Sequence, residues 1–416
     1  MNSTRHILGK RCTLCGRAYA FEEVELTCPD CKETGILDVE YDYDFVRTLF
    51  HEFRLGSARR DIFRFAPLLP LRLDGPRPVT RVGNTPTFFA QRLGRHIGLP
   101  NLWVKDDGRL PTASFKDRAS AIAVARAREL GIGLIAAAST GNAAASLAGL
   151  CAPEGITAVI FVPKTAPPAK IAQLCTFGAR VFLVDGSYDD AFALSLEASR
   201  RFGWYLRSTA INPLLAEGKK TGILEALEDI GFDRPPDYVF VSVGDGCIAA
   251  GLAKGIADLH ALGVIPYKPR LVGVQARESR VIYEAWKSGG ETIVPMKPAT
   301  RADSISVAFP RDAVKALRGI RNTSGLMLTV EDDAIFEAGR VLGTHSGIFA
   351  EPAAAAAFAG VLAMRASGQL AAHHRVLVFS TGSGLKDVAG ASMAAGKAQL
   401  ISGMADLEAI FSSPAQ

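Results

Sequence analysis

Hydrophobic and polar positions follow two different periods along this chain. From residue 101 onward, short apolar runs rich in β-branched residues end at Gly, Pro, Asp or Ser, which predicts buried strands. Stretches of helical period separate most of these runs, and such alternation predicts parallel sheets covered by helices on both faces. We therefore expect a doubly wound α/β fold. The predicted strands lie within residues 101–107, 133–139, 156–163, 179–186, 204–209, 237–244, 270–276 and 375–381.

The segment 187–203 illustrates the predicted helices. Its apolar residues recur so that one side would face a core, whereas its charged residues are available to water on the other side. The side chains expected on the buried side are Ala191, Leu194, Leu196 and Ala198.

Length and composition indicate a globular protein of two or three domains. The chain has 416 residues, of which 48% are hydrophobic and 21% charged, so it can build substantial cores. Its net charge of +5 is mild and its basic residues are scattered, which favours small anionic ligands over a nucleic-acid partner. No apolar run reaches the roughly 18 residues that span a bilayer, and the N-terminus lacks a secretory signal. We expect a cytoplasmic protein without a membrane partner.

Four cysteines near the N-terminus form two CxxC pairs. Two such pairs on short hairpins can direct four thiolates at one tetrahedral ion, so we expect a zinc ribbon with structural Zn²⁺. Four protein thiolates leave no open coordination position, which argues against a catalytic metal. A redox-active CxxC or a chance pairing is the alternative. The expected ligands are Cys12, Cys15, Cys28 and Cys31.

A lysine stands at the predicted start of a helix in the stretch ASFKDRAS, residues 113–120. Ser114 and Asp117 have the spacing of a capping box, which would put Lys116 in the first helical turn. Unpaired backbone N–H groups and the helix dipole disfavour an ammonium ion there, so a neutral, nucleophilic amine becomes accessible. Lys116 is therefore suited to forming a Schiff base. Taken alone, it is better explained as a surface lysine balanced by Asp117.

Three more loops follow predicted strands, where the ligands of parallel sheets collect. The stretch 139–146 combines hydroxyls, a glycine and the amide of Asn142 at a helix start, which suits a carboxylate, although simple capping also explains it. The glycines of 242–251 would expose N–H groups at another helix start, which suits a phosphate. The stretch 380–387 puts two hydroxyls at the end of a strand, where one could bond a pyridine nitrogen. An ordinary glycine-rich turn is the alternative.

The second of these loops contains GDGCIA, which also fits a loose dinucleotide fingerprint. The next predicted strand, however, leads to Gln275 and Arg277 where a ribose-binding acid would be needed. NAD is therefore the weaker choice of cofactor.

Together the four loops supply a Schiff-base lysine, an amide, a phosphate cradle and a hydroxyl, the groups that pyridoxal 5'-phosphate requires. The chain resembles the tryptophan synthase β family of pyridoxal-phosphate enzymes, known as fold type II, and within it the threonine synthases. The matching stretches, in the family's order, are GNTP (83–86), PTASFKDR (111–118), ASTGNAAAS (138–146), INPLLAEGKKTG (211–222) and STGSGLKD (380–387).

The resemblance implies which residues hold the cofactor. Lys116 would carry it as a Schiff base and later move protons, Asn142 would bond its 3'-oxygen, and Phe115 would pack against it. Thr381, with Ser380 as the alternative, would face the pyridine nitrogen. The residues implied for the cofactor phosphate are Gly244, Asp245, Gly246, Cys247 and Ile248.

The resemblance also implies the substrate site and the activity. Ser139, Thr140 and Gly141 would bind the carboxylate of an amino-acid substrate. Arg109, just before the lysine loop, is expected to recognise a substrate anion. The implied enzyme is a lyase that converts O-phosphohomoserine and water to threonine and phosphate, and the family suggests a homodimer.

Three domains follow from the same comparison. We expect the zinc ribbon in residues 1–45, a larger cofactor-binding α/β domain in 46–115 and 211–416, and a smaller α/β domain in 116–210. Three other residues are interpreted as structural: Glu351 as a charge in the first turn of a helix, and Lys219 and Lys220 as solvated helix lysines. The alternative for the two lysines is contact with a substrate phosphate.

Three positions depart from the family pattern. The phosphate loop reads GDGCIAAG where threonine synthases usually carry GNxGN, so Asp245 brings a negative charge near the expected dianion. Ser383 stands where many members have His or Asn, and Ala113 stands where Gly is usual. A β-eliminating or β-replacing relative, such as a serine/threonine ammonia-lyase or a cysteate synthase, is therefore an alternative. A non-catalytic sensor that keeps the fold is the alternative from another class.

Overall fold

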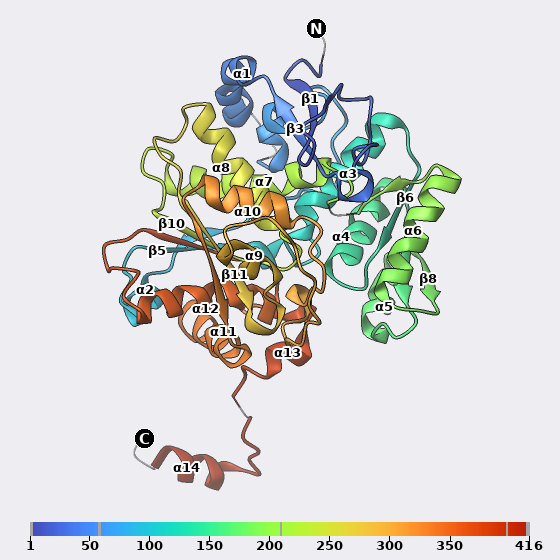
Figure 1. Ribbon diagram of the computed structural model, residues 1–416. Helices are drawn as coiled ribbons and strands as arrows, with labels where there is room; N and C mark the ends of the chain where they lie inside the picture. Colours follow the sequence, from blue (N-terminus) through green and yellow to red (C-terminus); the bar gives the residue numbers. More distant parts are fainter. Residues whose placement is uncertain (1–2, 57–59, 209, 397, 413–416) are drawn as a thin grey trace.

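The computed structural model describes residues 3–56, 60–208, 210–396 and 398–412, and Figure 1 shows its helices packed around two separate sheets. A strand is present in every segment that the apolar runs predicted, so the α/β prediction is confirmed. In the described residues, no helix is both long and apolar enough to cross a membrane.

The larger sheet has six strands, and all are parallel except the edge strand β4. In spatial order they are β12 (Leu326–Val330), β11 (Arg270–Ala276), β10 (Tyr238–Ser242), β13 (Val376–Ser380), β5 (Leu102–Asp106) and β4 (Thr87–Phe89). The helices around this sheet are α2 (Gln91–Ile97), α7 (Leu214–Ile230), α8 (Cys247–Ala261), α9 (Val281–Lys287), α10 (Ala313–Asn322), α11 (Asp332–Ser346) and α12 (Pro352–Ala366).

Alternate residues of these strands are buried on opposite faces, as a doubly wound sheet requires. Phe240 and Val272 belong to a core that they share with α11 and α12. Val239 and Leu377 belong to a second core with α7, α8 and α10. The near-continuous apolar runs in the sequence are therefore explained by burial on both faces.

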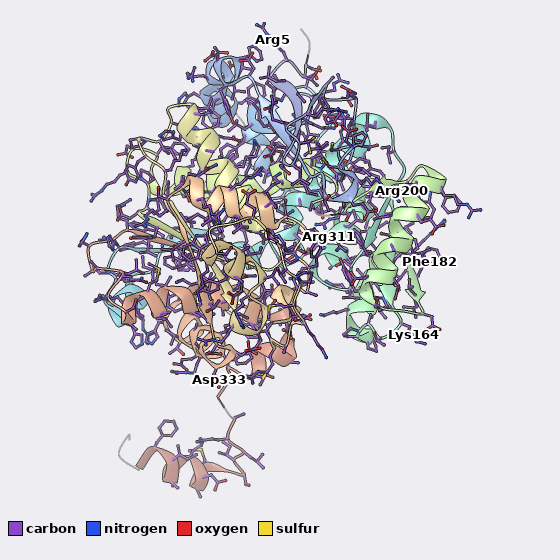
Figure 2. The ribbon with its side chains drawn as sticks, in the orientation of Figure 1. Arg5, Lys164, Phe182, Arg200, Arg311 and Asp333 are labelled. Carbon is purple, nitrogen blue, oxygen red and sulfur yellow. The ribbon has the colours of Figure 1, made fainter. Side chains whose placement is uncertain are left out.

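The smaller sheet has four parallel strands and the same two-sided covering. In spatial order they are β8 (Arg180–Val184), β7 (Thr157–Pro163), β6 (Leu134–Ala138) and β9 (Tyr205–Leu206). Its helices are α3 (Lys116–Leu130), α4 (Asn142–Cys151), α5 (Pro168–Thr176) and α6 (Tyr188–Phe202). Ala136 and Val159 pack with α6, whereas Ile135 and Ile160 pack with α3 and α4. Phe182 on the edge strand β8 is 48% exposed, and Figure 2 shows it at the outer side of this layer.

Helix α6 has the predicted boundaries, but one residue that was expected on its buried side is exposed. Ser187 and Asp190 form a capping box at its start, and Ala191, Leu196 and Ala198 are buried as predicted. Leu194, however, is 42% exposed, so its assignment to the buried side is wrong. The core face of the helix instead includes Phe192 and Ser195.

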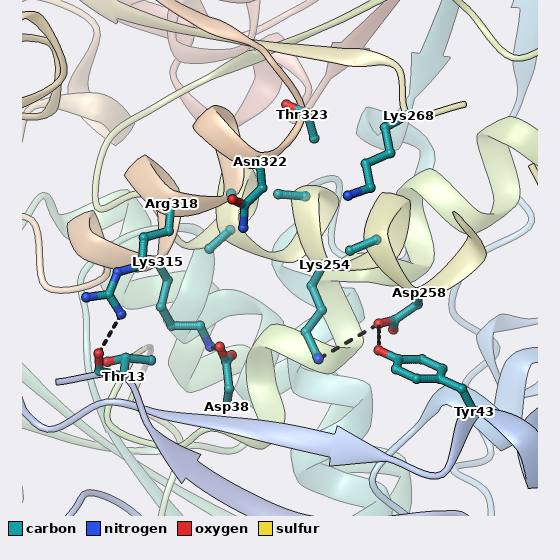
Figure 3. Close-up of a pocket in the computed structure, with 14 residues that line it drawn as sticks. Thr13, Asp38, Tyr43, Lys254, Asp258, Lys268, Lys315, Arg318, Asn322 and Thr323 are labelled. Atoms are coloured by element: carbon teal, nitrogen blue, oxygen red, sulfur yellow. Dashed lines mark hydrogen bonds and ion pairs between the residues drawn. The ribbon is translucent and has the colours of Figure 1, made fainter. Parts of the chain in front are cut away.

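The N-terminal segment forms a three-stranded antiparallel sheet in the order β2-β1-β3. Its strands are β1 (Ile7–Cys12), β2 (Ala18–Tyr19) and β3 (Leu37–Tyr41), and α1 (Tyr43–Gly56) follows. Polar contacts attach this small sheet to α10: Lys315 pairs with Asp38, and Arg318 donates a hydrogen bond to the carbonyl of Thr13 (Figure 3). Two further helices, α13 (Val388–Ser392) and α14 (Met404–Ser412), lie near the C-terminus.

Candidate functional site

Lys116 is the first residue of α3, as the sequence predicts. The expected capping box is absent. The Asp117 carboxylate instead accepts hydrogen bonds from the backbone and the hydroxyl of Thr112, and among the described residues the buried Ser114 hydroxyl has no partner. Burial raises the pKa of Asp117, while its bonds to Thr112 oppose that rise. The lysine is half-buried, so its amine lies at the edge of the interior and not on the open surface.

Arg118 fixes the start of α3, although the sequence analysis gave it no role. Its side chain is fully buried and donates to Asp107 at 2.6 and 2.9 Å and to Glu225 at 2.8 Å. Burial opposes ionisation of Glu225, yet Arg118 and its other cationic neighbours hold the pKa of that carboxyl well below its usual range. Because Glu225 belongs to α7, this network joins α3 to α7 and holds Lys116 in position.

Phe115, the residue before Lys116, packs in the interior. The ring is 1% exposed and meets Phe379 edge to face, with ring centroids 6.1 Å apart. A Cβ atom at Gly222 of α7 would lie 2.9 Å from this ring, so only glycine leaves room for it. The backbone N–H of Phe115 donates to the carbonyl of Thr381 at 2.8 Å, which joins the lysine loop to the end of β13.

The loop after β6 lies open at its tip. Ser139 Oγ accepts a hydrogen bond from the N–H of Gly141 at 3.2 Å, and Ser139, Thr140 and Gly141 are all half-buried. A Cβ atom at Gly141 would meet no described atom within 4 Å, so there is space in front of this loop. The following helix start adds unpaired N–H groups, which suits an anion such as a carboxylate.

Asn142 and Glu351 meet across the space between the two sheets. Asn142 Nδ2 donates to both carboxylate oxygens of Glu351 at 3.1 Å. Glu351 stands at the start of α12, as predicted, but its side chain makes no hydrogen bond to the N–H groups of that helix. Burial raises the pKa of Glu351, whereas the bond from Asn142 and the nearby Lys116 oppose that rise. A carboxyl group that the sequence analysis treated as structural therefore lies close to the lysine.

The glycine-rich loop after β10 turns directly into the start of a helix. Gly246 has φ 91°, which disfavours any side chain, and a Cβ atom there would lie 2.9 Å from the Asp312 carbonyl. Helix α8 starts directly afterwards at Cys247, whose thiol is buried and has its pKa raised by that burial. Asp245 is half-buried, and its carbonyl accepts from the N–H of Asp312 at 3.1 Å.

Ser380 and Thr381 lie at the carboxyl end of β13 and are 2% and 6% exposed. Among the described residues, Ser380 Oγ is buried without any hydrogen-bond partner. A buried hydroxyl without a partner costs free energy, so a ligand atom that bonds it would relieve that cost. This orphaned hydroxyl fits the ring nitrogen of pyridoxal phosphate, and the fit favours Ser380 over Thr381.

Two buried cations near Lys116 were missed or misassigned from the sequence. Arg207, just after β9, is 2% exposed and bonds Ser120 Oγ at 3.1 Å and the carbonyl of Lys116 at 3.5 Å. Lys219 on α7 is 1% exposed, so its assignment as a solvated lysine is wrong. Lys220 is also fully buried, which contradicts the same assignment.

Arg109, the residue expected to recognise a substrate anion, has a 71% exposed side chain that lies 3.5 Å from the carboxylate of Asp106.

Side-chain contacts also join the two layers around this space. Lys170 on α5 pairs with Asp303 at 2.7 Å, and Lys386 donates to Gln173 at 3.0 Å. The Arg311 guanidinium lies 3.8 Å from the centre of the Phe192 ring on α6, and Figure 2 shows Arg311 between the two layers. These contacts connect α5 and α6 of the smaller layer with loops of the larger one.

The four ribbon cysteines converge as predicted. Their Sγ atoms all lie within 4.8 Å of one another, and those of Cys15 and Cys28 are 3.7 Å apart. Zinc–sulfur bonds of about 2.3 Å in a tetrahedron place the sulfurs roughly 3.8 Å apart. The four thiols therefore fit one Zn²⁺ ion without any open coordination position.

A cavity of about 240 Å³ lies between the ribbon and helices α8 and α10 (Figure 3). Its lining includes Lys254, Lys268 and Lys315, balanced in part by Asp38 and Asp258. None of its lining residues belongs to the loops around Lys116. The cavity is therefore separate from the candidate active site.

Known proteins with similar sequences or folds identify the family of this chain. The family described as "Pyridoxal-phosphate dependent enzyme" matches residues 79–382. The chain is 34% identical over 380 residues to the threonine synthase of Methanocaldococcus jannaschii, covering 91% of this chain and 93% of that protein. It is 36% identical to the threonine synthase of Methanosarcina acetivorans, covering 91% and 92%. Among solved structures, threonine deaminase isoform 2 of Solanum lycopersicum has a similar fold, with a TM-score of 0.67 at 21% identity, covering 85% of this chain and 89% of that one. The chain therefore belongs to the pyridoxal-phosphate-dependent enzymes of fold type II, in the group of the threonine synthases.

Proposed function

We propose that this protein converts O-phosphohomoserine and water to threonine and inorganic phosphate. Similarity to threonine synthases along nearly the whole chain carries the proposal. The arrangement of Lys116, the open loop at Ser139 and the orphaned Ser380 hydroxyl is consistent with it.

Pyridoxal phosphate, when bound, would withdraw electrons from the substrate and make its α proton acidic. The chain's own residues supply the remaining functions. The Lys116 amine would remove the α proton and then a β proton, and phosphate would leave from the γ carbon with its bonding electrons. The same amine would return one proton to the γ carbon and one to the α carbon, while water adds its hydroxyl at the β carbon. Glu351 lies near this amine. The N–H groups and hydroxyls of residues 139–141 would orient the substrate carboxylate. Phe115 would support one face of the ring, and Ser380 Oγ would bond its nitrogen.

The test is an assay of purified protein with O-phosphohomoserine that measures both phosphate and threonine. We expect equal amounts of the two products, and a loss of at least about 1,000-fold in Lys116→Ala because base and attachment point are both removed. No turnover above that control would contradict the proposed substrate. Keto acid from serine or threonine would instead identify an ammonia-lyase, and incorporation of sulfite would identify a cysteate synthase.

We also propose that the ribbon holds one structural Zn²⁺ ion. Wild-type protein purified under reducing conditions should contain one zinc per chain by elemental analysis, and Cys28→Ser should contain much less. Cys175→Ser is the matched control because Cys175 is exposed and isolated from the cluster. Absence of zinc from the wild type, or equal loss in both variants, would contradict the assignment.

A further inference from the structure

Lys219 is a buried cation without a partner in the protein. Only 1% of the residue is exposed, and within the part of the chain that the structure describes its amine has neither an ion pair nor a hydrogen bond. A buried ammonium ion without a counter-charge is costly. The pKa of Lys219 is lowered to about 8, chiefly by burial; Arg207 and Lys116 contribute to the fall by repulsion, whereas Cys247 and Asp312 oppose it. The protein therefore carries a positive group here that a bound anion would neutralise.

The packing of α7 on α8 determines where this side chain points. A Cβ atom at Gly251 of α8 would lie 2.7 Å from Lys219 Cβ, and one at Gly255 would lie 2.5 Å from Ile223. The contacts advance in the same direction along both helices, so the two helices run parallel. Side chains on a helix lean toward its N-terminus. Lys219 therefore points toward the start of α8 at Cys247, where the glycine-rich loop ends.

The groups around Lys219 have an excess of positive charge. Arg207 and Lys116 are cations, and Cys247 carries a buried thiol whose pKa is raised. Asp312 is the carboxylate in this group, and burial raises its pKa, which weakens it as a counter-ion. The first N–H groups of α8 add partial positive charge on the same side.

We propose that Lys219 binds a phosphate group at the start of α8 and supplies the charge that neutralises it. The inference rests on the proposed function in one respect, namely that phosphorylated molecules enter this site. The phosphate group can come from two sources. One is the cofactor, through its 5'-phosphate, and the other is the phosphorylated substrate with the inorganic phosphate that it releases. A cationic side chain also offsets the negative charge that Asp245 brings to this loop.

The experiment uses cofactor-free protein, prepared as wild type and as Lys219→Met, Lys219→Gln and Lys220→Met. Affinities for pyridoxal phosphate and for pyridoxal, which lacks the phosphate, are measured by absorbance. Inorganic phosphate is then titrated calorimetrically into the cofactor-loaded proteins. Lys220→Met is the matched control because Lys220 is equally buried but paired with Glu217 and Asp258 at 2.6 Å.

We expect both Lys219 variants to lose about 10- to 100-fold in affinity for one phosphate source, as expected for a charged hydrogen bond. Loss for pyridoxal phosphate but not pyridoxal would assign the contact to the cofactor. Loss for inorganic phosphate alone would assign it to the substrate and product. Affinities for both sources within about 3-fold of wild type would overturn the proposal. None of these measurements depends on turnover of phosphohomoserine, so failure of the proposed reaction would be distinguishable.

Discussion

Lys219 and Lys220 are adjacent on α7 and equally buried, yet they lie in two different electrostatic regions. Lys220 faces the ribbon side, where Glu217 and Asp258 each approach its amine to 2.6 Å and the Tyr41 ring centre is 4.1 Å away. Tyr41 and Tyr43 donate to the same two carboxylates at 2.9 and 2.7 Å. Lys219 faces the cofactor side, where its described neighbours include two further cations and no paired carboxylate.

The contrast separates charges that stabilise the fold from charges that prepare a binding site. On the ribbon side Lys220 pairs with Glu217 and Asp258, and Lys315 pairs with Asp38. Although burial opposes it, Lys220 and Lys254 hold the pKa of Asp258 below its usual value. On the side of Lys116, the Lys219 ammonium and the Ser380 hydroxyl have no partner among the described residues. Polar groups without partners cluster at functional sites because a ligand completes them.

The largest effect is expected from removing the paired lysine. Lys220→Met would leave Glu217 and Asp258 without their shared cation and lower the free energy of unfolding by about 3–5 kcal/mol. Urea denaturation of cofactor-free protein measures this change. Lys219→Met should leave that stability unchanged or raise it, because it removes a charge that has no partner. Equal destabilisation by both substitutions would remove the distinction between the two regions.

The pH dependence of stability tests the same difference between the two lysines. Lys219 has a pKa of about 8 in the fold against 10.5 for an ordinary lysine. Below pH 8 it is protonated in both states, and its burial costs about 3 kcal/mol. Between pH 8 and 10.5 the folded protein releases its proton first, so stability relative to Lys219→Met should rise across this interval. A constant difference between the two cofactor-free proteins from pH 7 to 10 would contradict the assignment.

A smaller effect is expected at the end of β13. Ser380→Ala removes the hydroxyl that would bond the ring nitrogen and should weaken binding of pyridoxal phosphate by about 5- to 20-fold. The same variant should not destabilise the cofactor-free protein, because the hydroxyl lacks a partner there. Thr381→Val is the control. If Thr381→Val weakens binding more than Ser380→Ala, Thr381 and not Ser380 faces the nitrogen.

The smallest effect concerns the backbone of the lysine loop. Ala113 has φ 63°, a left-handed conformation that favours glycine. Ala113→Gly should therefore raise the free energy of unfolding by about 0.5 kcal/mol, after allowing for the greater entropy of an unfolded glycine. A midpoint shift in urea measures it. Destabilisation would show that the alanine methyl group makes a contact that outweighs its backbone strain.

Most of the sheet architecture could be predicted because strands buried on both faces leave continuous apolar runs. Strand β12 (Leu326–Val330) was not among the predicted strands. It has the same kind of apolar run, bounded by Gly325 and Glu331, so the pattern was sufficient to predict it. The side of α6 that is buried was harder to predict. Leu194 fits an apolar pattern on that helix, but the sheet packs against the arc that includes Phe192.

The candidate site was predictable where function follows from backbone position, as for Lys116 at a helix start. Hydrogen-bond partners were not predictable where the same residue spacing is compatible with two patterns. Asp117 accepts from Thr112 and does not form the capping box with Ser114 that the spacing suggested. The burial of Lys219 depends on Gly251 and Gly255, which lie more than 30 residues later in the chain. No local pattern around Lys219 contains that information.

The close approach of α7 and α8 has a consequence for how ligand preference could change. Gly251 and Gly255 set the separation of the two helix axes, and a single methyl group at either position would force them apart. The position of the Lys219 ammonium therefore depends on the distance between two helices and not on the conformation of a flexible loop. A substitution at Gly251 or Gly255, which would contact no ligand, could change which anion binds near Lys219, because it would displace the ammonium by a fraction of an ångström.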